Sequence, residues 1–186
     1  HNSIFLGLSI TIFLIIALII GNNMSLMVQP ESWLGYFKSH GGGWLVNSAD
    51  PSLIPRYLHF IAAAIAVGGL AIALFFDLNR SLGKEEKSRW VRYGCNWFTG
   101  ATIINFGIGF WFLSTLYDRV IIPPDPLGQL FFVFLIGSVT CIAFAMINAQ
   151  CYRLYKAVGW TAATVFLMTL ARETVLNAYL HEYITL

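Results

Sequence analysis

Five long apolar runs dominate the sequence, and each is long enough to cross a lipid bilayer. A membrane-spanning helix needs about 20 apolar residues, because the hydrocarbon core is about 30 Å thick and a helix rises about 1.5 Å per residue. Only 11% of the 186 residues are charged, whereas soluble domains carry about 25%. The mean hydropathy of +0.70 also indicates a chain that is apolar overall. The sequence therefore predicts an all-α, polytopic transmembrane helix bundle with about five spans.

The spans are expected to form one transmembrane domain that covers residues 1–186. The first run has neither a basic flank nor a clear cleavage pattern, so we interpret it as a span rather than as a signal peptide. The connection after the third span is rich in proline, which cannot continue a helix, and a tight turn is expected at residues 156–159. The predicted spans are residues 3–27, 53–78, 93–116, 127–152 and 160–183.

Lysine and arginine are distributed unequally between the two expected sides of the membrane. Seven lie on one side and three on the other, and Arg172 lies inside the fifth span. The side richer in lysine and arginine faces the cytoplasm in most membrane proteins. We therefore expect a multi-pass inner (cytoplasmic) membrane protein with a cytoplasmic N-terminus and an external C-terminus. The seven residues are Arg80, Lys84, Lys87, Arg89, Arg92, Arg153 and Lys156.

His59 is the first candidate for chemistry, because a histidine inside the hydrocarbon region needs a polar partner or a cofactor. It follows Leu53 by six residues and so lies about 9 Å from the outer end of its helix. Arg56 lies one turn further out on the same face. Small residues continue inward from His59, leaving room for a flat macrocycle or for a close neighbouring helix. They are Ala62, Ala63, Ala66 and Gly69.

This layout is typical of a b-type haem held between membrane helices, with Arg56 directed at the haem propionates. The alternative is a packing seam, in which His59 hydrogen-bonds a neighbouring helix. No Cys-x-x-Cys-His motif is present, so a covalent c-type haem is not expected. The three cysteines are interpreted as small buried apolar residues.

The fifth span carries a polar face within an apolar run. Glu173, Asn177 and His181 recur every four residues, and Arg172 adjoins them. An ionisable residue in a membrane helix indicates function by default. Here the candidate roles are propionate binding by Arg172, axial haem ligation by His181 at a depth similar to that of His59, and a proton-linked quinone site at Glu173 and Asn177. A structural Arg172–Glu173 ion pair is the alternative.

Small and polar residues also share one face of the third span, and helix packing is the simplest interpretation of that face. They are Asn96, Gly100, Gly107 and Trp111.

Residues 10–73 resemble subunit I of cytochrome bd quinol oxidases and its shorter relatives. The resemblance rests on Asn22-Asn23-Met24-Ser25-Leu26-Met27-Val28-Gln29-Pro30 at the end of the first span and on Pro55-Arg56-Tyr57-Leu58-His59-Phe60 at the start of the second. In that family a similar Asn…Met-x-x-Pro stretch precedes the helix whose outer-side histidine binds the low-spin b haem. The resemblance implies that His59 ligates haem iron, and the predicted orientation agrees with that family.

The chain departs from that family at several points. The oxidases use a methionine near the outer start of a later helix as the second haem ligand, and residues 131–139 contain none. His181 is the proposed replacement. The external quinol-binding loop is reduced to about residues 117–126, and the helices that carry the oxygen-reducing haem pair are not evident. Oxygen reduction by this chain alone is therefore not expected.

The expected function is that of a haem-b membrane subunit in a respiratory electron-transfer complex. It would pass electrons between the quinone pool and an external, periplasmic multihaem c-type cytochrome, together with other membrane subunits and lipid. His59 and His181 would ligate the iron, and Arg56 and Arg172 would bind the propionates. A cofactor-free membrane anchor or scaffold is the main alternative. A transporter subunit is a third, which the position of the prolines in loops or at span ends argues against. The sequence contains no basic patch of the kind that would indicate binding to nucleic acid.

Overall fold

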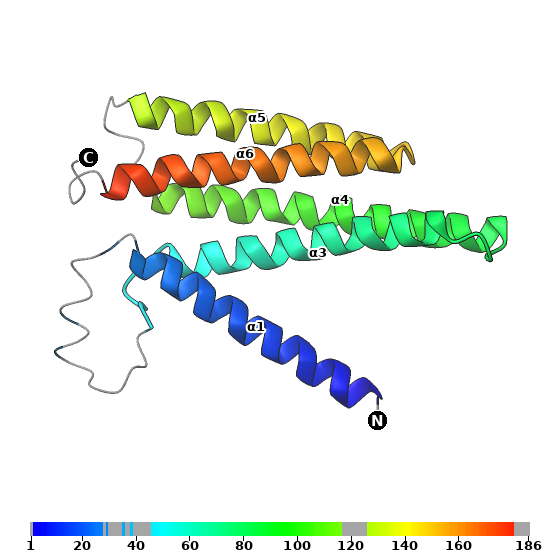
Figure 1. The fold of residues 1–186 in the computed structure, drawn as a ribbon, viewed down its shortest axis with the longest axis horizontal. Helices are drawn as coiled ribbons and strands as arrows, with labels where there is room; N and C mark the ends of the chain where they lie inside the picture. Colours follow the sequence, from blue (N-terminus) through cyan, green and yellow to red (C-terminus); the bar gives the residue numbers. More distant parts are fainter. Residues whose placement is uncertain are drawn as a thin grey trace. The chain divides into compact units, whose positions relative to one another are not determined.

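A computed structural model of the chain describes residues 2–27, 29, 35, 38, 46–116 and 126–180. Within these residues the regular structure is helical, and five helices are long and apolar enough to cross a membrane (Figure 1). The predicted all-α transmembrane bundle is confirmed, and the chain is a multi-pass membrane protein. The helices are α1 (Asn2–Met27), α3 (Leu53–Leu78), α4 (Lys84–Thr115), α5 (Pro126–Gln150) and α6 (Leu154–Leu180).

The chain divides into two compact units, residues 1–58 and residues 59–186. The first contains α1, the segment before α3 and the first turn and a half of α3. The apolar side chains of α1 are exposed along most of its length, as expected of a helix that faces lipid or another protein. The second unit contains the rest of α3 together with α4, α5 and α6.

Two apolar clusters hold the second unit together, one toward each end. The larger cluster joins α3, α4, α5 and α6, and small side chains such as Ala73, Ala145 and Ala157 are fully buried in it. The smaller cluster joins the last turns of α4 to the start of α5 and the later part of α6 around Leu116, Phe131 and Ala171. Consecutive helices therefore run antiparallel, and small residues let them pack closely.

Helices α3 and α4 touch backbone to backbone at Gly69 and Gly94. A Cβ atom placed on Gly94 would lie 2.5 Å from the Gly69 carbonyl oxygen and 2.6 Å from the Ala73 nitrogen. Only glycine fits at such a contact. Gly69 belongs to the small residues that follow His59 in the sequence. At this position the small residue makes room for a close neighbouring helix, which was one of the two interpretations of these residues.

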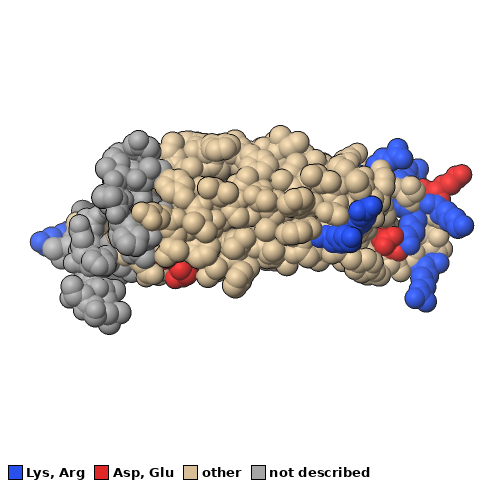
Figure 2. Space-filling model, turned by 90° about the horizontal axis from the view of Figure 1, so that it is seen from above, with Lys and Arg blue, Asp and Glu red and all other residues tan. Residues whose placement is uncertain are grey.

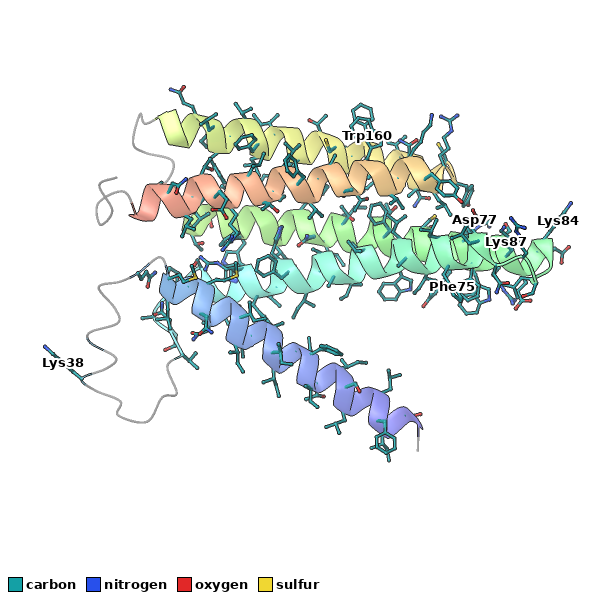
Figure 3. The ribbon with its side chains drawn as sticks, viewed as in Figure 1. Lys38, Phe75, Asp77, Lys84, Lys87 and Trp160 are labelled. Atoms are coloured by element: carbon teal, nitrogen blue, oxygen red, sulfur yellow. The ribbon has the colours of Figure 1, made fainter. Side chains whose placement is uncertain are left out.

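Lysine and arginine gather at the end of the second unit where α3 leads into α4 and α5 leads into α6 (Figure 2). We call this the basic end. Here α4 begins at Lys84, nine residues before the predicted start of the third span, because lysine and glutamate are good helix formers. Lys87 Nζ lies 3.3 Å from Asp77 Oδ1 on α3, and both residues are seen at this end in Figure 3. The seven residues of the predicted cytoplasmic side lie in this region or in the turns beside it.

The turn between α5 and α6 lies at residues 151–153, whereas the sequence predicted it at residues 156–159. The Arg153 N–H donates to the Asn148 carbonyl over 2.8 Å, and the Tyr152 N–H donates to the Ala149 carbonyl over 3.0 Å. These are the two hydrogen bonds of a Schellman motif. Tyr152 adopts the left-handed conformation, with φ of 55°, where glycine is the usual residue. A glycine therefore did not mark this turn, and Gly159 lies inside α6 instead.

Candidate functional site

The imidazole of His59 packs against α4 within the second unit. A Cβ atom placed on Gly109 would lie 3.4 Å from His59 Cε1 and 3.5 Å from Nδ1. The ring of Phe112 lies 6.4 Å from the imidazole, centroid to centroid, and the backbone of Asn105 interacts with the ring. These contacts come from successive turns of α4. Helix α4 is therefore the immediate neighbour of the histidine that the sequence singled out.

Two buried polar atoms in this region have no hydrogen-bond partner among the described residues, His59 Nδ1 and Asn105 Oδ1. Buried polar atoms are paired in the great majority of cases, and an unpaired one often marks a site that binds something else. In a membrane the cost of leaving such an atom unpaired is higher still, because lipid offers no hydrogen bonds. The unpaired nitrogen is the distinguishing feature of the site.

The donor chemistry of this region fits a haem. Histidine is a common axial ligand of haem iron, and Gly109 places no side chain against the imidazole of His59. No group of three or more His, Cys, Asp or Glu side chains gathers within the described residues. In the described part of the chain, His59 is therefore not a member of a cluster of metal-ligating side chains.

A buried polar network in the first unit was not predicted from the sequence. Asn47 is 1% exposed; its backbone N–H donates to Asn22 Oδ1 over 2.7 Å, and its side-chain amide donates to Ser25 Oγ and to Gln29 Oε1, each over 2.9 Å. The Ser25 hydroxyl in turn donates to Asp50 Oδ2. The network thereby fastens the end of α1 to the segment that precedes α3.

Arg56 is connected to this network through Ser52. The Ser52 N–H donates to Asp50 Oδ1 over 2.8 Å and the Ser52 hydroxyl donates to Asp50 Oδ2 over 2.9 Å. The Arg56 guanidinium donates from Nη2 to Ser52 Oγ over 2.9 Å. Arg56 precedes His59 by one turn on the continuous helix α3, so the network orients the side chain that the sequence assigned to a propionate.

The sequence contained a signal for this network. Asn47-Ser48-Ala49-Asp50-Pro51-Ser52 is a string of turn and cap residues directly before a helix. Asp50 accepts the N–H of the residue two positions on, as aspartate does in an Asx turn. The partner residues Asn22 and Ser25 lie one turn apart on α1, but only the fold shows that they meet this segment.

The polar face of α6 is exposed on the surface of this chain. Arg172 Nη1 donates to Glu173 Oε1 over 2.8 Å, and the two side chains are 44% and 48% exposed. Asn177, one turn further along, is also exposed. The ion pair is the structural alternative that the sequence left open. His181, the proposed second ligand, lies outside the described residues.

The face of the third span that was interpreted as a packing surface is open instead. Asn96, Gly100 and Gly107 are exposed on α4, and Trp111 is 48% exposed. Helix α4 packs through the faces that carry Gly94, Cys95 and Phe98. Composition alone did not separate these faces, because small residues occur on both.

Comparison with known proteins adds no relative to this description. No family model, curated protein or solved structure matches the chain. The resemblance to subunit I of cytochrome bd quinol oxidases therefore stays a proposal that rests on the residues of the chain itself.

Proposed function

We propose that the chain is a haem-b-binding membrane subunit of a respiratory electron-transfer complex. In this role it exchanges electrons between the quinone pool and an external multihaem c-type cytochrome, as one subunit of a quinone–cytochrome oxidoreductase. One observation carries the proposal: His59 lies inside a membrane helix, and its Nδ1 atom is buried without a hydrogen bond of normal geometry to the described residues. The Asn22 to Pro30 and Pro55 to Phe60 motifs support the same reading of His59.

Different residues of the chain would bind different parts of the haem. His59 would hold the haem iron, and His181 is proposed as its second ligand. The Asp50–Ser52 hydrogen bonds orient Arg56. Arg56 and Arg172 would neutralise the propionates by charge-assisted hydrogen bonds. Arg172 uses one of its five N–H donors in the hydrogen bond to Glu173, so other N–H groups remain for a propionate. A bound haem supplies a one-electron redox centre, whose potential depends on ligand identity, burial and nearby charge.

A quinone fits the proposal at Glu173 and Asn177. Both side chains are exposed on α6, where a quinone that diffuses within the bilayer can reach them. A carboxylate and an amide can accept and donate the hydrogen bonds that quinone oxygens need. We place the chain in the inner membrane, with the basic end and the N-terminus in the cytoplasm, because lysine and arginine concentrate on the cytoplasmic side.

The test is a dithionite-reduced minus oxidised visible spectrum, with a pyridine haemochrome assay, on protein purified without its partners. We expect a b-type spectrum that His59→Ala abolishes and that His40→Ala, a control at another histidine, leaves intact. Imidazole added to His59→Gly should restore part of the signal, because it replaces the missing ligand. Circular dichroism and size-exclusion chromatography show whether each variant folds. A normal spectrum in folded His59→Ala protein would exclude His59 as a ligand.

A cofactor-free membrane anchor is the second candidate, and the exposed ion pair on α6 favours it. Arg172 and Glu173 lie on the surface of an apolar helix, and ionisable residues in membrane helices usually face protein rather than lipid. A partner subunit that covers this face would explain them without a cofactor. Folded protein with no haem, which still binds its partner subunits and loses them in Arg172→Ala/Glu173→Ala, would establish this function instead.

A further inference from the structure

A hollow of about 430 Å³ lies at the basic end against the first turns of α4, and it is rich in hydrogen-bond donors. Its lining carries three cations and one carboxylate. The cations make no ion pair with any described residue, whereas Lys87, on another face of α4, is bound to Asp77. Figure 3 shows Lys84 pointing outward at this end. The lining residues are Lys84, Glu85, Ser88, Arg89 and Arg92.

The start of α4 adds further donors to this hollow. Gly83 occupies the N-cap position and provides no side-chain acceptor for the first N–H groups of the helix, which are otherwise unsatisfied. Arginine, serine and free N–H groups together form a site that is complementary to a phosphate. The excess of positive charge over the single carboxylate of Glu85 favours an anionic ligand over a zwitterionic one.

A second hollow, of about 390 Å³, follows the same helix away from the basic end. It lies between α3 and α4, and apolar atoms dominate its lining. Gly100 and Ala62, which have the smallest side chains of the lining together with Ala101, are among its lining residues. A Cβ atom placed on Gly100 would meet nothing within 4 Å, so the hollow is open at this point. The other lining residues are Ile65, Tyr93, Asn96, Trp97, Ala101 and Ile104.

One residue of the first hollow, Arg89, lies in line with residues of the second hollow along α4. Arg89, Tyr93, Asn96 and Gly100 are spaced by three or four residues, which places them above one another on a helix. From Tyr93 to Ile104 the second hollow rises about 16 Å at 1.5 Å per residue. This matches one leaflet of a hydrocarbon core that is about 30 Å thick.

Aromatic rings mark the level at which the two hollows meet. Phe76 stacks on Trp90 at 4.9 Å, Trp90 contacts Tyr93 at 5.8 Å, and Tyr93 contacts Trp97 at 6.2 Å, all between ring centroids. Tryptophan and tyrosine concentrate at the boundary between lipid head groups and hydrocarbon. The charged hollow therefore lies at head-group level and the apolar hollow lies at acyl-chain level.

We propose that this face of α4 binds an anionic phospholipid of the leaflet at the basic end. Arg89, Arg92 and the Ser88 hydroxyl hold the phosphate, and one acyl chain occupies the groove over Gly100. An apolar groove begins one turn beyond Arg89 on the same helix, and this favours a lipid over free phosphate, which would use only the first hollow. The site is independent of the haem proposal, because none of its residues takes part in that site.

The experiment measures lipid binding to delipidated, detergent-purified protein by native mass spectrometry and by thermal shift. The probes are phosphatidylglycerol, phosphatidylcholine and inorganic phosphate. Phosphatidylglycerol should bind and stabilise the protein more than phosphatidylcholine does. Arg89→Gln/Arg92→Gln should weaken phosphatidylglycerol binding about tenfold or more, because charge-assisted hydrogen bonds are lost. The control Arg153→Gln/Lys156→Gln removes two cations of the same end outside the hollow and should leave binding nearly unchanged.

A second pair of variants tests the groove without disturbing the packing of the helices. Gly100→Leu fills the groove and should reduce binding of both lipids, whereas Gly107→Leu, an exposed position on the same helix with equal free space, should not. If Arg89→Gln/Arg92→Gln and Arg153→Gln/Lys156→Gln lost the same amount of phosphatidylglycerol binding, general surface charge would explain the binding and the proposal would be overturned. Stabilisation by inorganic phosphate equal to that by phosphatidylglycerol, with no effect of Gly100→Leu, would identify a phosphate site and overturn the lipid assignment.

Discussion

Asp50 is the residue on which the buried network of the first unit converges. Its carboxylate accepts the Ser25 hydroxyl and both the N–H and the hydroxyl of Ser52, and the residue is only 6% exposed. Leaving buried donors without an acceptor costs about 1–3 kcal/mol for each group. A single carboxylate therefore secures the end of α1 to the segment that precedes α3.

We expect Asp50→Ala to destabilise the protein by about 3 kcal/mol, because it removes the acceptor of several buried donors at once. Asp77→Ala is the matched control, since Asp77 is 36% exposed in its ion pair with Lys87, and such pairs contribute about 0–1 kcal/mol. Reversible unfolding in SDS micelles, followed by tryptophan fluorescence, gives both free energies. Equal effects of the two variants would contradict the role assigned to the network.

Single residues also show what sequence reasoning can and cannot reach. His59 was identifiable because a histidine in an apolar run is conspicuous by its chemistry alone. Its neighbours Asn105 and Gly109 were not, because their importance depends on how α4 is rotated against α3. Several rotations satisfy the same apolar composition, so contacts between helices are decided by side-chain packing that a single sequence does not display.

At the scale of helices, the crossing of α3 and α4 depends on the absence of side chains. We expect Gly69→Ala to destabilise the pair by about 1–3 kcal/mol, as overpacking does. The added methyl would lie 2.7 Å from the Phe98 nitrogen and 2.9 Å from the Gly94 carbonyl oxygen. Both are backbone atoms, so the helices must move apart.

The neighbouring glycine provides the control for this prediction. A Cβ atom on Gly68 would meet nothing within 4 Å, so Gly68→Ala should leave stability unchanged or raise it slightly, because alanine favours helix. The same unfolding assay compares the two variants. A loss of stability in Gly68→Ala as large as that in Gly69→Ala would show that backbone propensity, rather than the close crossing, sets the effect.

The helices themselves were largely predictable from hydropathy, whereas their ends were less so. The first two candidate spans agree with the predicted residues, because apolar runs bounded by polar residues leave little choice. The charged start of α4 and the turn at Tyr152 differ from expectation. Helix-forming lysine and glutamate extend α4 beyond its apolar run, whereas at Tyr152 the hydrogen bonds of the turn form without a glycine.

At the scale of the whole molecule, the distribution of charge predicts a defined orientation in the membrane. Ser81 lies in the turn at the basic end and Ser48 lies in the segment before α3; both are exposed. In a chain whose native cysteines have been replaced, a membrane-impermeant maleimide added to intact cells should label Ser48→Cys and spare Ser81→Cys. Opening the cells should then allow both to react. The reverse pattern would place the basic end outside.

The contact between Gly69 and Gly94 also limits how this sequence can change over evolutionary time. At each position every other amino acid is too large, because the space is filled by the backbone of the opposite helix. A single substitution cannot be rescued by trimming a neighbouring side chain, since backbone atoms of the opposite helix stand in the way together with the Cβ atoms of Trp97 and Ala73. Gly68 and Gly107 face open space, so substitutions at these two positions should be tolerated. In any set of homologous sequences the two kinds of glycine should therefore separate, with one pair fixed and the other variable.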